Sequence, residues 1–169
     1  MEQNADHKLE YKDILSNFYN NHKKKTYYFL IFLIIVISLV VFLIQNNVKK
    51  NSLIAEKYVE AGLYFSSDNK LKSKTLYEEI ILSENKFYSI LALNEILEKE
   101  LVSDKTKILN YFKIAIKVSK SQEQVDLINF KKALYLIKIG TTNEAYDLLN
   151  NLIDKNSKFK LIAEEVITK

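Results

Sequence analysis

The chain has 169 residues, of which 48% are hydrophobic, and it contains two glycines and no proline, tryptophan or cysteine. This composition argues against an all-β protein, whose turns need Gly and Pro, and the lack of cysteine excludes disulfides and leaves the redox compartment open. The net charge is +4, but lysines and acidic residues are interspersed and there is no arginine to read phosphate or guanine, so we expect no binding to nucleic acid.

The N-terminal tail, residues 1–26, carries one apolar stripe. Its members follow helical spacing and are Tyr11, Ile14, Leu15, Phe18 and Tyr19. The stripe predicts a short amphipathic helix that lies on the cytoplasmic leaflet of a membrane or binds a partner. A partly ordered tail is the alternative, and the sequence does not decide between the two.

Residues 27–44 form an almost uninterrupted apolar run, in which Ser38 is the one clearly polar side chain. As an α-helix this run is about 27 Å long, close to the roughly 30 Å hydrocarbon core of a bilayer, and a helix satisfies its own backbone polar groups in lipid. A buried core helix would usually show a polar face, and a cleaved signal peptide would have a shorter apolar region that ends at small residues. We therefore predict an uncleaved transmembrane helix in contact with membrane lipid.

Lysines close to this run set the predicted orientation. Lys12, Lys23, Lys24 and Lys25 precede the run, and Lys49, Lys50 and Lys57 follow it. Because lysine and arginine concentrate on the cytoplasmic side of a membrane, the excess of one lysine places the tail in the cytoplasm. We thus expect a single-pass protein of the bacterial inner membrane, with residues 45–169 in the periplasm.

Residues 45–169 predict a series of short helices separated by polar breaks, so the fold class is all-α. Three helices are expected at 52–66, 71–82 and 86–100. A fourth is expected after Ser103-Asp104, a fifth at 123–139, a sixth after Thr141 or Thr142 and a seventh after Asn156-Ser157. Asp68 or Asn69 is suited to cap the start of the second helix, because a short polar side chain can accept hydrogen bonds from the first backbone amides. Gly140 is suited to end the fifth, where the backbone turns left-handed.

Successive helix pairs show a regular spacing. Tyr77, Tyr111 and Leu148 occupy similar places in the second helix of each pair, and the spacings are 111 − 77 = 34 and 148 − 111 = 37 residues. A period near 34 built from helix pairs is typical of tetratricopeptide repeats. We therefore predict a tetratricopeptide-like α-solenoid after the single transmembrane helix, with a plain helical bundle as the alternative.

The third pair fits this repeat best. Ala133, Gly140 and Ala145 match its small residue in the first helix, its turn glycine and its small residue early in the second helix. Small residues are needed there because the two helices cross closely. The first pair departs from the pattern, with Lys74 or Thr75 where a small residue is expected.

A short tail, one span and three degenerate tetratricopeptide-like units with a closing helix form a plan that resembles the YfgM family of bacterial inner-membrane proteins over nearly the whole chain. The segments that carry the resemblance are Leu15-x-x-Phe18-Tyr19, Tyr88-x-x-Leu91-Ala92 and Gly140-x-x-x-x-Ala145. The resemblance implies a tetratricopeptide-like domain that faces the periplasm. It also implies an accessory subunit of the SecYEG translocon that meets periplasmic chaperones.

The sequence offers few candidates for catalytic or metal-binding residues. The only histidines, His7 and His22, lie in the tail, so residues 45–169 contain neither His nor Cys and lack common zinc ligands and base–nucleophile pairs. There is no glycine-rich phosphate loop. Adjacent acids such as Glu78 and Glu79 point about 100° apart on a helix and do not converge. We therefore expect no enzyme activity, no cofactor and no metal site.

Two functional classes remain. The first is a membrane-anchored protein-binding module, whose tether raises the effective concentration of a partner, and the second is a structural subunit of another inner-membrane complex, held by its span and tail with the repeats as a scaffold. For the first class the expected partners are translocon subunits, periplasmic chaperones or client proteins.

Candidate partner-binding residues lie on the first helix of each pair, which lines the concave surface in helical-repeat proteins. They are Tyr58, Tyr88, Asn94, Phe130 and Lys131. For Tyr88 and Phe130 a place in the core between helices is the alternative. Asn94 and Lys131 are the clearer candidates, because polar side chains are less often fully buried.

Overall fold

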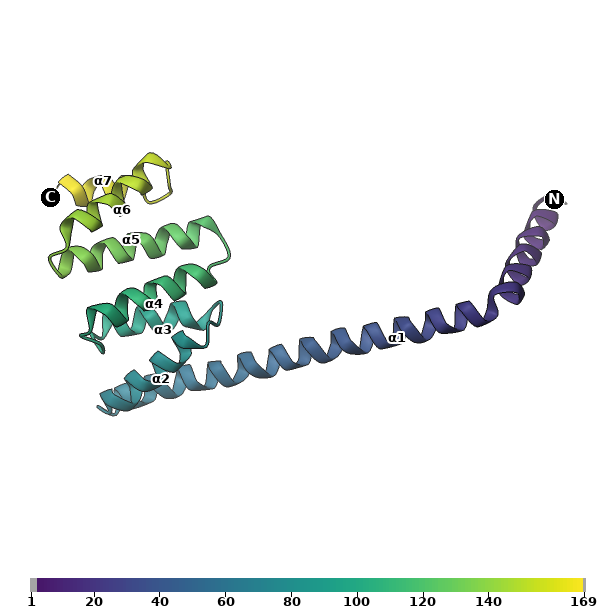
Figure 1. The fold of residues 1–169 in the computed structure, drawn as a ribbon, viewed down its shortest axis with the longest axis horizontal. Helices are drawn as coiled ribbons and strands as arrows, with labels where there is room; N and C mark the ends of the chain where they lie inside the picture. Colours follow the sequence, from purple (N-terminus) through teal and green to yellow (C-terminus); the bar gives the residue numbers. More distant parts are fainter. Residues whose placement is uncertain (1–2, 169) are drawn as a thin grey trace. The chain divides into compact units, whose positions relative to one another are not determined.

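The computed structural model describes residues 3–168, with side chains placed for residues 13–14, 16–17 and 23–168. Within these bounds the secondary structure consists of seven α-helices and no strand (Figure 1). The helices are α1 (Gln3–Ser66), α2 (Lys70–Leu82), α3 (Tyr88–Glu98), α4 (Lys105–Val118), α5 (Gln122–Lys138), α6 (Thr142–Asp154) and α7 (Lys160–Thr168). The predicted all-α class and the long apolar N-terminal helix are confirmed.

The chain divides into two compact units, Met1–Lys50 and Asn51–Lys169. The boundary between them lies inside α1, so the helix expected at 52–66 is the last part of α1 and not a separate element. The polar residues at 45–51 do not end α1, because they include neither proline nor glycine, and polar side chains alone cost a helix little.

In the first unit, α1 carries the apolar run. The segment Lys23–Ser66 contains an 18-residue window with a mean hydropathy of 3.1, and none of that window is buried. The core helix of a soluble protein would be mostly covered by its neighbours. The described part of the chain therefore has one helix that is long and apolar enough to cross a membrane, and nothing in that part covers it.

The predicted helix at residues 8–22 is part of α1, so its backbone is helical. Of the apolar stripe, Ile14 is 60% exposed. Tyr11, Leu15, Phe18 and Tyr19 lie outside the described side chains.

In the second unit, each helix from α2 to α7 packs against the next one, and α2 also contacts α4 (Figure 1). The buried residues form two clusters. The first joins the end of α1 to α2, α3 and α4 around Tyr77 and Phe112, and the second joins α5, α6 and α7 around Leu136 and Leu149. Because α5 also places Ile128 in the first cluster, this helix links the two halves of the core.

Small residues are fully buried in the helix pairs. Ala133 and Ala145, the positions expected at a close crossing, have no exposed area. In α2 the fully buried small residue is Ser73. It directly precedes Lys74 and Thr75, the two positions compared above with the repeat.

The predicted helix ends are largely confirmed. Asn69 Oδ1 accepts a hydrogen bond from the backbone amide of Lys72 at 3.2 Å, and Asp104 Oδ1 accepts one from that of Thr106 at 2.8 Å. Gly140 follows α5 with φ of +77°, the left-handed conformation expected after a helix. Thr141 stands at the N-cap of α6 but makes no capping hydrogen bond.

Four other residues adopt the left-handed conformation although they are not glycine. They are Asp68, Glu84, Glu100 and Asn156, with φ between 50° and 59°. Each follows the end of a helix, which shows that the chain turns there without the glycine that usually marks such a turn.

Candidate binding groove

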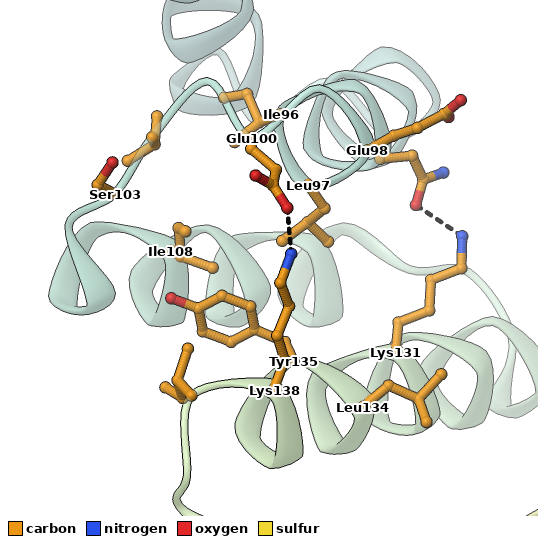
Figure 2. Close-up of a pocket in the computed structure, with 13 residues that line it drawn as sticks. Ile96, Leu97, Glu98, Glu100, Ser103, Ile108, Lys131, Leu134, Tyr135 and Lys138 are labelled. Atoms are coloured by element: carbon orange, nitrogen blue, oxygen red, sulfur yellow. Dashed lines mark hydrogen bonds and ion pairs between the residues drawn. The ribbon is translucent and has the colours of Figure 1, made fainter.

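The second unit contains an open groove of about 540 Å³ between α3 and α5 (Figure 2). One wall comes from α3 and the loop that follows it, and the other comes from α5. Ile108, at 3% exposure, closes the groove from α4. The groove therefore lies across three consecutive helices rather than inside one helix pair.

The sequence places one face of each helix in this groove by simple spacing. On α3, Asn94, Leu97 and Glu98 follow one another at i, i+3 and i+4. On α5, Lys131, Leu134, Tyr135 and Lys138 follow at i, i+3, i+4 and i+7. Residues with this spacing share a helix face, so each wall is a single continuous stripe.

Two side-chain bridges join the walls. Lys131 Nζ donates a hydrogen bond to Asn94 Oδ1 at 2.7 Å, and Lys138 forms an ion pair with Glu100 (Figure 2). The side chains of Lys138 and Glu100 are 62% and 70% exposed. Exposed ion pairs contribute little free energy and are screened by salt, so this bridge can open readily when another group enters the groove.

The space between the bridges is lined by apolar side chains. Leu134 is 40% exposed and Ile139 is 36% exposed, although both are large hydrophobic residues. Leu97 and Tyr135 are half-buried beside them. Burial raises the pKa of Tyr135, so its hydroxyl stays protonated and is available as a hydrogen-bond donor. An apolar surface with a few fixed polar groups is the usual composition of a site that binds another molecule.

Of the five residues predicted from sequence, the structure brings Asn94 and Lys131 together in the groove. Both are half-buried and bonded to each other, so they are not freely exposed surface residues. Phe130 lies apart from them and stacks on Phe159 of the α5–α7 cluster, with ring centroids 6.0 Å apart.

Tyr58 and Tyr88 form a separate contact, with ring centroids 5.8 Å apart, and both pack against the first core cluster. The Tyr58 hydroxyl donates a hydrogen bond to Glu95 Oε1 at 2.9 Å. Burial and this hydrogen bond hold the pKa of Tyr58 well above its usual range. Burial and the charge of Glu95 raise the pKa of Tyr77 to about 12. These tyrosines therefore belong to an internal network that joins α1, α2 and α3.

Glu95 is the acceptor at the centre of this network, and Lys99 pairs with it one turn later. Burial, the largest single effect, would raise the pKa of Glu95, but the hydrogen bonds from Lys99 and Tyr58 and the charge of Lys99 outweigh it. The pKa of Glu95 is therefore lowered, and its carboxylate is charged at neutral pH.

Sequence reasoning missed most of the groove, namely Leu97, Glu98, Glu100, Leu134, Tyr135 and Lys138. The signal that could have found four of them was present. Applying the i+3 and i+4 spacing from Asn94 and Lys131 reaches Leu97, Glu98, Leu134 and Tyr135. Glu100 carried no such signal, because it lies past the end of α3, where helical spacing no longer applies.

Within the described side chains, no group of three or more His, Cys, Asp or Glu residues could hold a metal ion. His7 and His22 lie outside those side chains. Comparison with known proteins adds no relative: no family model, no curated protein and no solved structure matches the chain. Its function therefore has to be inferred from its own residues.

Proposed function

We propose that the chain is a single-pass membrane protein that binds a segment of another protein in the groove between α3 and α5. The observation that carries this proposal is the groove itself, where large apolar side chains stay exposed between two bridges that can exchange partners. Sites that bind other molecules are usually concave and apolar with a few placed polar groups, and the groove has this composition. The apolar run of α1, which the described chain leaves uncovered, supplies the anchor.

The second unit is proposed to be a tetratricopeptide-like array, with the end of α1 and α2, α3 and α4, and α5 and α6 as its pairs. The two groove stripes support this, because Asn94 and Lys131 are separated by the same 37 residues as Leu97 and Leu134. Fully buried small residues support it as well. Ala61 and Ser73 are 73 − 61 = 12 residues apart, and Ala133 and Ala145 are 145 − 133 = 12 residues apart.

In this arrangement α3 and α5 are the first helices of neighbouring pairs. Their shared face is then the concave surface that helical-repeat proteins use for recognition. Tethering to a membrane confines the groove to the volume beside the bilayer, so contacts of modest strength suffice to hold a membrane-associated partner.

The lysine count around the apolar run supports a tail in the cytoplasm and the groove in the periplasm of the bacterial inner membrane. The resemblance to the YfgM family narrows the proposed partner to translocon subunits, periplasmic chaperones or their clients. The proposal assigns the groove to binding rather than catalysis, because its lining side chains include neither histidine nor cysteine and its two lysines take part in bridges between the walls.

A structural subunit of another inner-membrane complex is the second candidate, and one observation favours it. Leu53, Val59 and Leu63 near the end of α1 are 61–63% exposed, and Val59 and Leu63 line a shallow hollow on that helix. In this alternative α1 would pack against other subunits, and the groove between α3 and α5 would remain empty.

Crosslinking in native membranes separates the two. A photoreactive amino acid is placed at Leu134, in the groove, or at Leu71 of α2, which is 75% exposed but outside the groove, or at Leu63 on α1. Crosslinks to a discrete partner from Leu134 and not from Leu71 support the binding module. Crosslinks from Leu63 alone support the structural subunit and remove the groove from the proposal.

A further inference from the structure

The two lysines of the groove have different partners. Lys138 is paired with the carboxylate of Glu100, whereas Lys131 has only the neutral Oδ1 of Asn94, at 2.7 Å. Among the described side chains no carboxylate forms an ion pair with Lys131, and Figure 2 shows that the carboxylate of Glu98, which lines the groove from α3, points away from it. The groove therefore contains one cation that has a hydrogen-bond acceptor but no counter-charge.

The lack of a counter-charge at Lys131 affects binding because of where this lysine lies. Its side chain is half-buried beside Leu134, while Lys138 is exposed. Opposite charges attract more strongly in a partly enclosed site than on an exposed surface. A carboxylate that enters the groove would therefore gain more at Lys131 than at a surface lysine.

We propose that the groove selects a peptide segment with a Glu or Asp side chain next to apolar residues. Lys131 binds the incoming carboxylate, and Leu97, Leu134 and Tyr135 bind the apolar neighbours. This inference rests on the proposed function and specifies the chemistry of the partner that the groove accepts.

One wall of the groove gives an example of this chemistry. In Glu100-Leu101-Val102 the glutamate carboxylate pairs with Lys138 while Val102 lines the groove. A side-chain carboxylate on a continuous segment can thus pair with a lysine of α5 beside an apolar neighbour, which favours a side chain over a chain end as the group that Lys131 accepts.

The spacing of the two lysines gives a further requirement. Lys131 and Lys138 are seven residues apart on α5, which corresponds to about 10 Å along the helix. In an extended segment every second side chain lies on the same face, so acids two or four positions apart, about 7 or 13 Å, can both face α5. If Glu100 were removed, Lys138 would accept a second acid placed two or four positions from the first.

The test uses the full chain in detergent and end-blocked peptide libraries. One library has a fixed central Glu flanked by random apolar residues, and the matched library has Gln at that position. A third library has the same apolar residues, the Gln and a free terminal carboxylate. We expect the wild-type protein to retain the Glu library at least about tenfold better than the Gln library, as for one charged hydrogen bond.

Two variants assign the preference to Lys131. Asn94→Asp supplies an internal carboxylate with nearly the same shape 2.7 Å from Lys131 Nζ, so the preference for Glu should disappear while the fold is kept. Lys131→Gln should abolish it as well. Lys113→Gln removes the same charge from the exposed surface of α4 and should leave the preference intact.

A third variant tests the spacing. Glu100→Gln should raise the retention of peptides with two Glu residues two or four positions apart by at least about threefold, with little change for peptides with one Glu. Peptides with two Glu residues three positions apart, which lie on opposite faces of an extended segment, are the matched control. No such gain would overturn the assignment of Lys138 as the second position.

Other outcomes overturn the inference. Equal retention of the Glu and Gln libraries, or a preference that survives in Asn94→Asp or Lys131→Gln, removes Lys131 as the carboxylate site. Stronger retention of the free-carboxylate library replaces a side chain with a chain end, and self-association that Asn94→Asp abolishes makes the occupant a second copy of the chain. In any of these cases, crosslinks from Leu134 in native membranes would still uphold the proposed function.

Discussion

Two buried serines show how much a single hydrogen bond matters at the scale of one residue. Ser73 and Ser89 both have no exposed area. The Ser89 hydroxyl bonds to the carbonyl oxygens of Ile80 and Ile81 at 3.0 and 3.1 Å. The Ser73 hydroxyl is buried without a hydrogen-bond partner among the described residues. Burying an unpaired hydroxyl is costly, whereas a paired one is nearly neutral, so the two sites should respond in opposite ways.

We predict that Ser73→Ala raises the free energy of unfolding by about 1 kcal/mol, because it removes the unpaired hydroxyl and alanine favours a helix. Ser89→Ala should lower it by about 1 kcal/mol, because the buried hydrogen bond from the Ser89 hydroxyl is lost. Thermal unfolding of the full chain, followed by near-ultraviolet circular dichroism, measures both. Destabilisation by both variants to the same extent would show that Ser73 has a partner after all.

Glu95 makes the stability of the second unit depend on pH. Its pKa is lowered from the ordinary 4.5, so the charged carboxylate stabilises the folded state at higher pH. This contribution is lost as the pH falls below about 4.5 and through the lowered folded-state pKa. In Glu95→Gln, unfolding midpoints should therefore fall less steeply on acidification than in wild type. Glu144→Gln, on the exposed face of α6, is the matched control for the loss of one carboxylate.

The stability of Glu95→Gln at neutral pH provides a check on this prediction. At neutral pH Glu95→Gln should already be less stable than wild type, since Lys99 and Tyr58 lose a charged acceptor. The two proteins should converge in acid. Parallel curves for Glu95→Gln and wild type would mean that the Tyr58–Glu95–Lys99 network does not control the acid response.

At the scale of the helix, the sequence predicted those ends that have a local chemical signal. Asn69, Asp104 and Gly140 each carry one, as a capping oxygen or as freedom to turn left-handed. Glu84 and Glu100 also turn left-handed after a helix, but glutamate has no preference for that conformation. The ends expected at residues 82 and 100 lie at or near the observed ends at Leu82 and Glu98, but no local signal in the sequence indicated the left-handed turns that follow them.

The residues of the candidate site also divide into those that the sequence indicated correctly and those that it did not. Asn94 and Lys131 could be proposed because polar residues at helical spacing on the first helices of two pairs are easy to see in the sequence. Tyr58, Tyr88 and Phe130 share that spacing but pack into the core, since an aromatic ring gains more free energy there than at a surface. The sequence pattern marks which residues share a face; it does not say how deeply that face is covered.

The two glycines offer a test at the helix scale. Gly140 has φ of +77°, and a Cβ added there would meet nothing within 4 Å, so Gly140→Ala should cost about 1–2 kcal/mol through backbone strain alone. Gly62 lies within α1, and a Cβ there would be 3.7 Å from the Tyr77 hydroxyl, an ordinary contact. Gly62→Ala should therefore stabilise by about 0.5–1 kcal/mol.

Thermal unfolding of the two variants beside wild type measures both effects. Opposite shifts are expected. A stabilised Gly140→Ala would contradict the left-handed end of α5, and a destabilised Gly62→Ala would mean that α1 and α2 approach more closely at Tyr77 than this distance allows.

At the scale of the whole molecule, the proposed orientation depends on few charges. Lys23, Lys24 and Lys25 directly precede the apolar run and are exposed, while Lys49 and Lys50 follow it. Because the lysine excess on the N-terminal side is small, this cluster decides the orientation. The chain has no natural cysteine, so single cysteines report the exposure of each side without background labelling.

We predict that Lys113→Cys, on α4, reacts with a membrane-impermeant maleimide added to spheroplasts, and that Ser16→Cys, on α1, reacts only after detergent is added. Combining either cysteine with the triple change of Lys23, Lys24 and Lys25 to Gln reverses the lysine bias, because it leaves Lys8 and Lys12 before the run and Lys49, Lys50 and Lys57 close after it. A substantial fraction of Ser16→Cys should then become reactive from outside.

Labelling of Ser16→Cys in the parent protein would invert the proposed topology and place the groove in the cytoplasm, away from periplasmic partners. An unchanged pattern in the triple variant would mean that features beyond these lysines, such as the folding of the second unit, set the orientation.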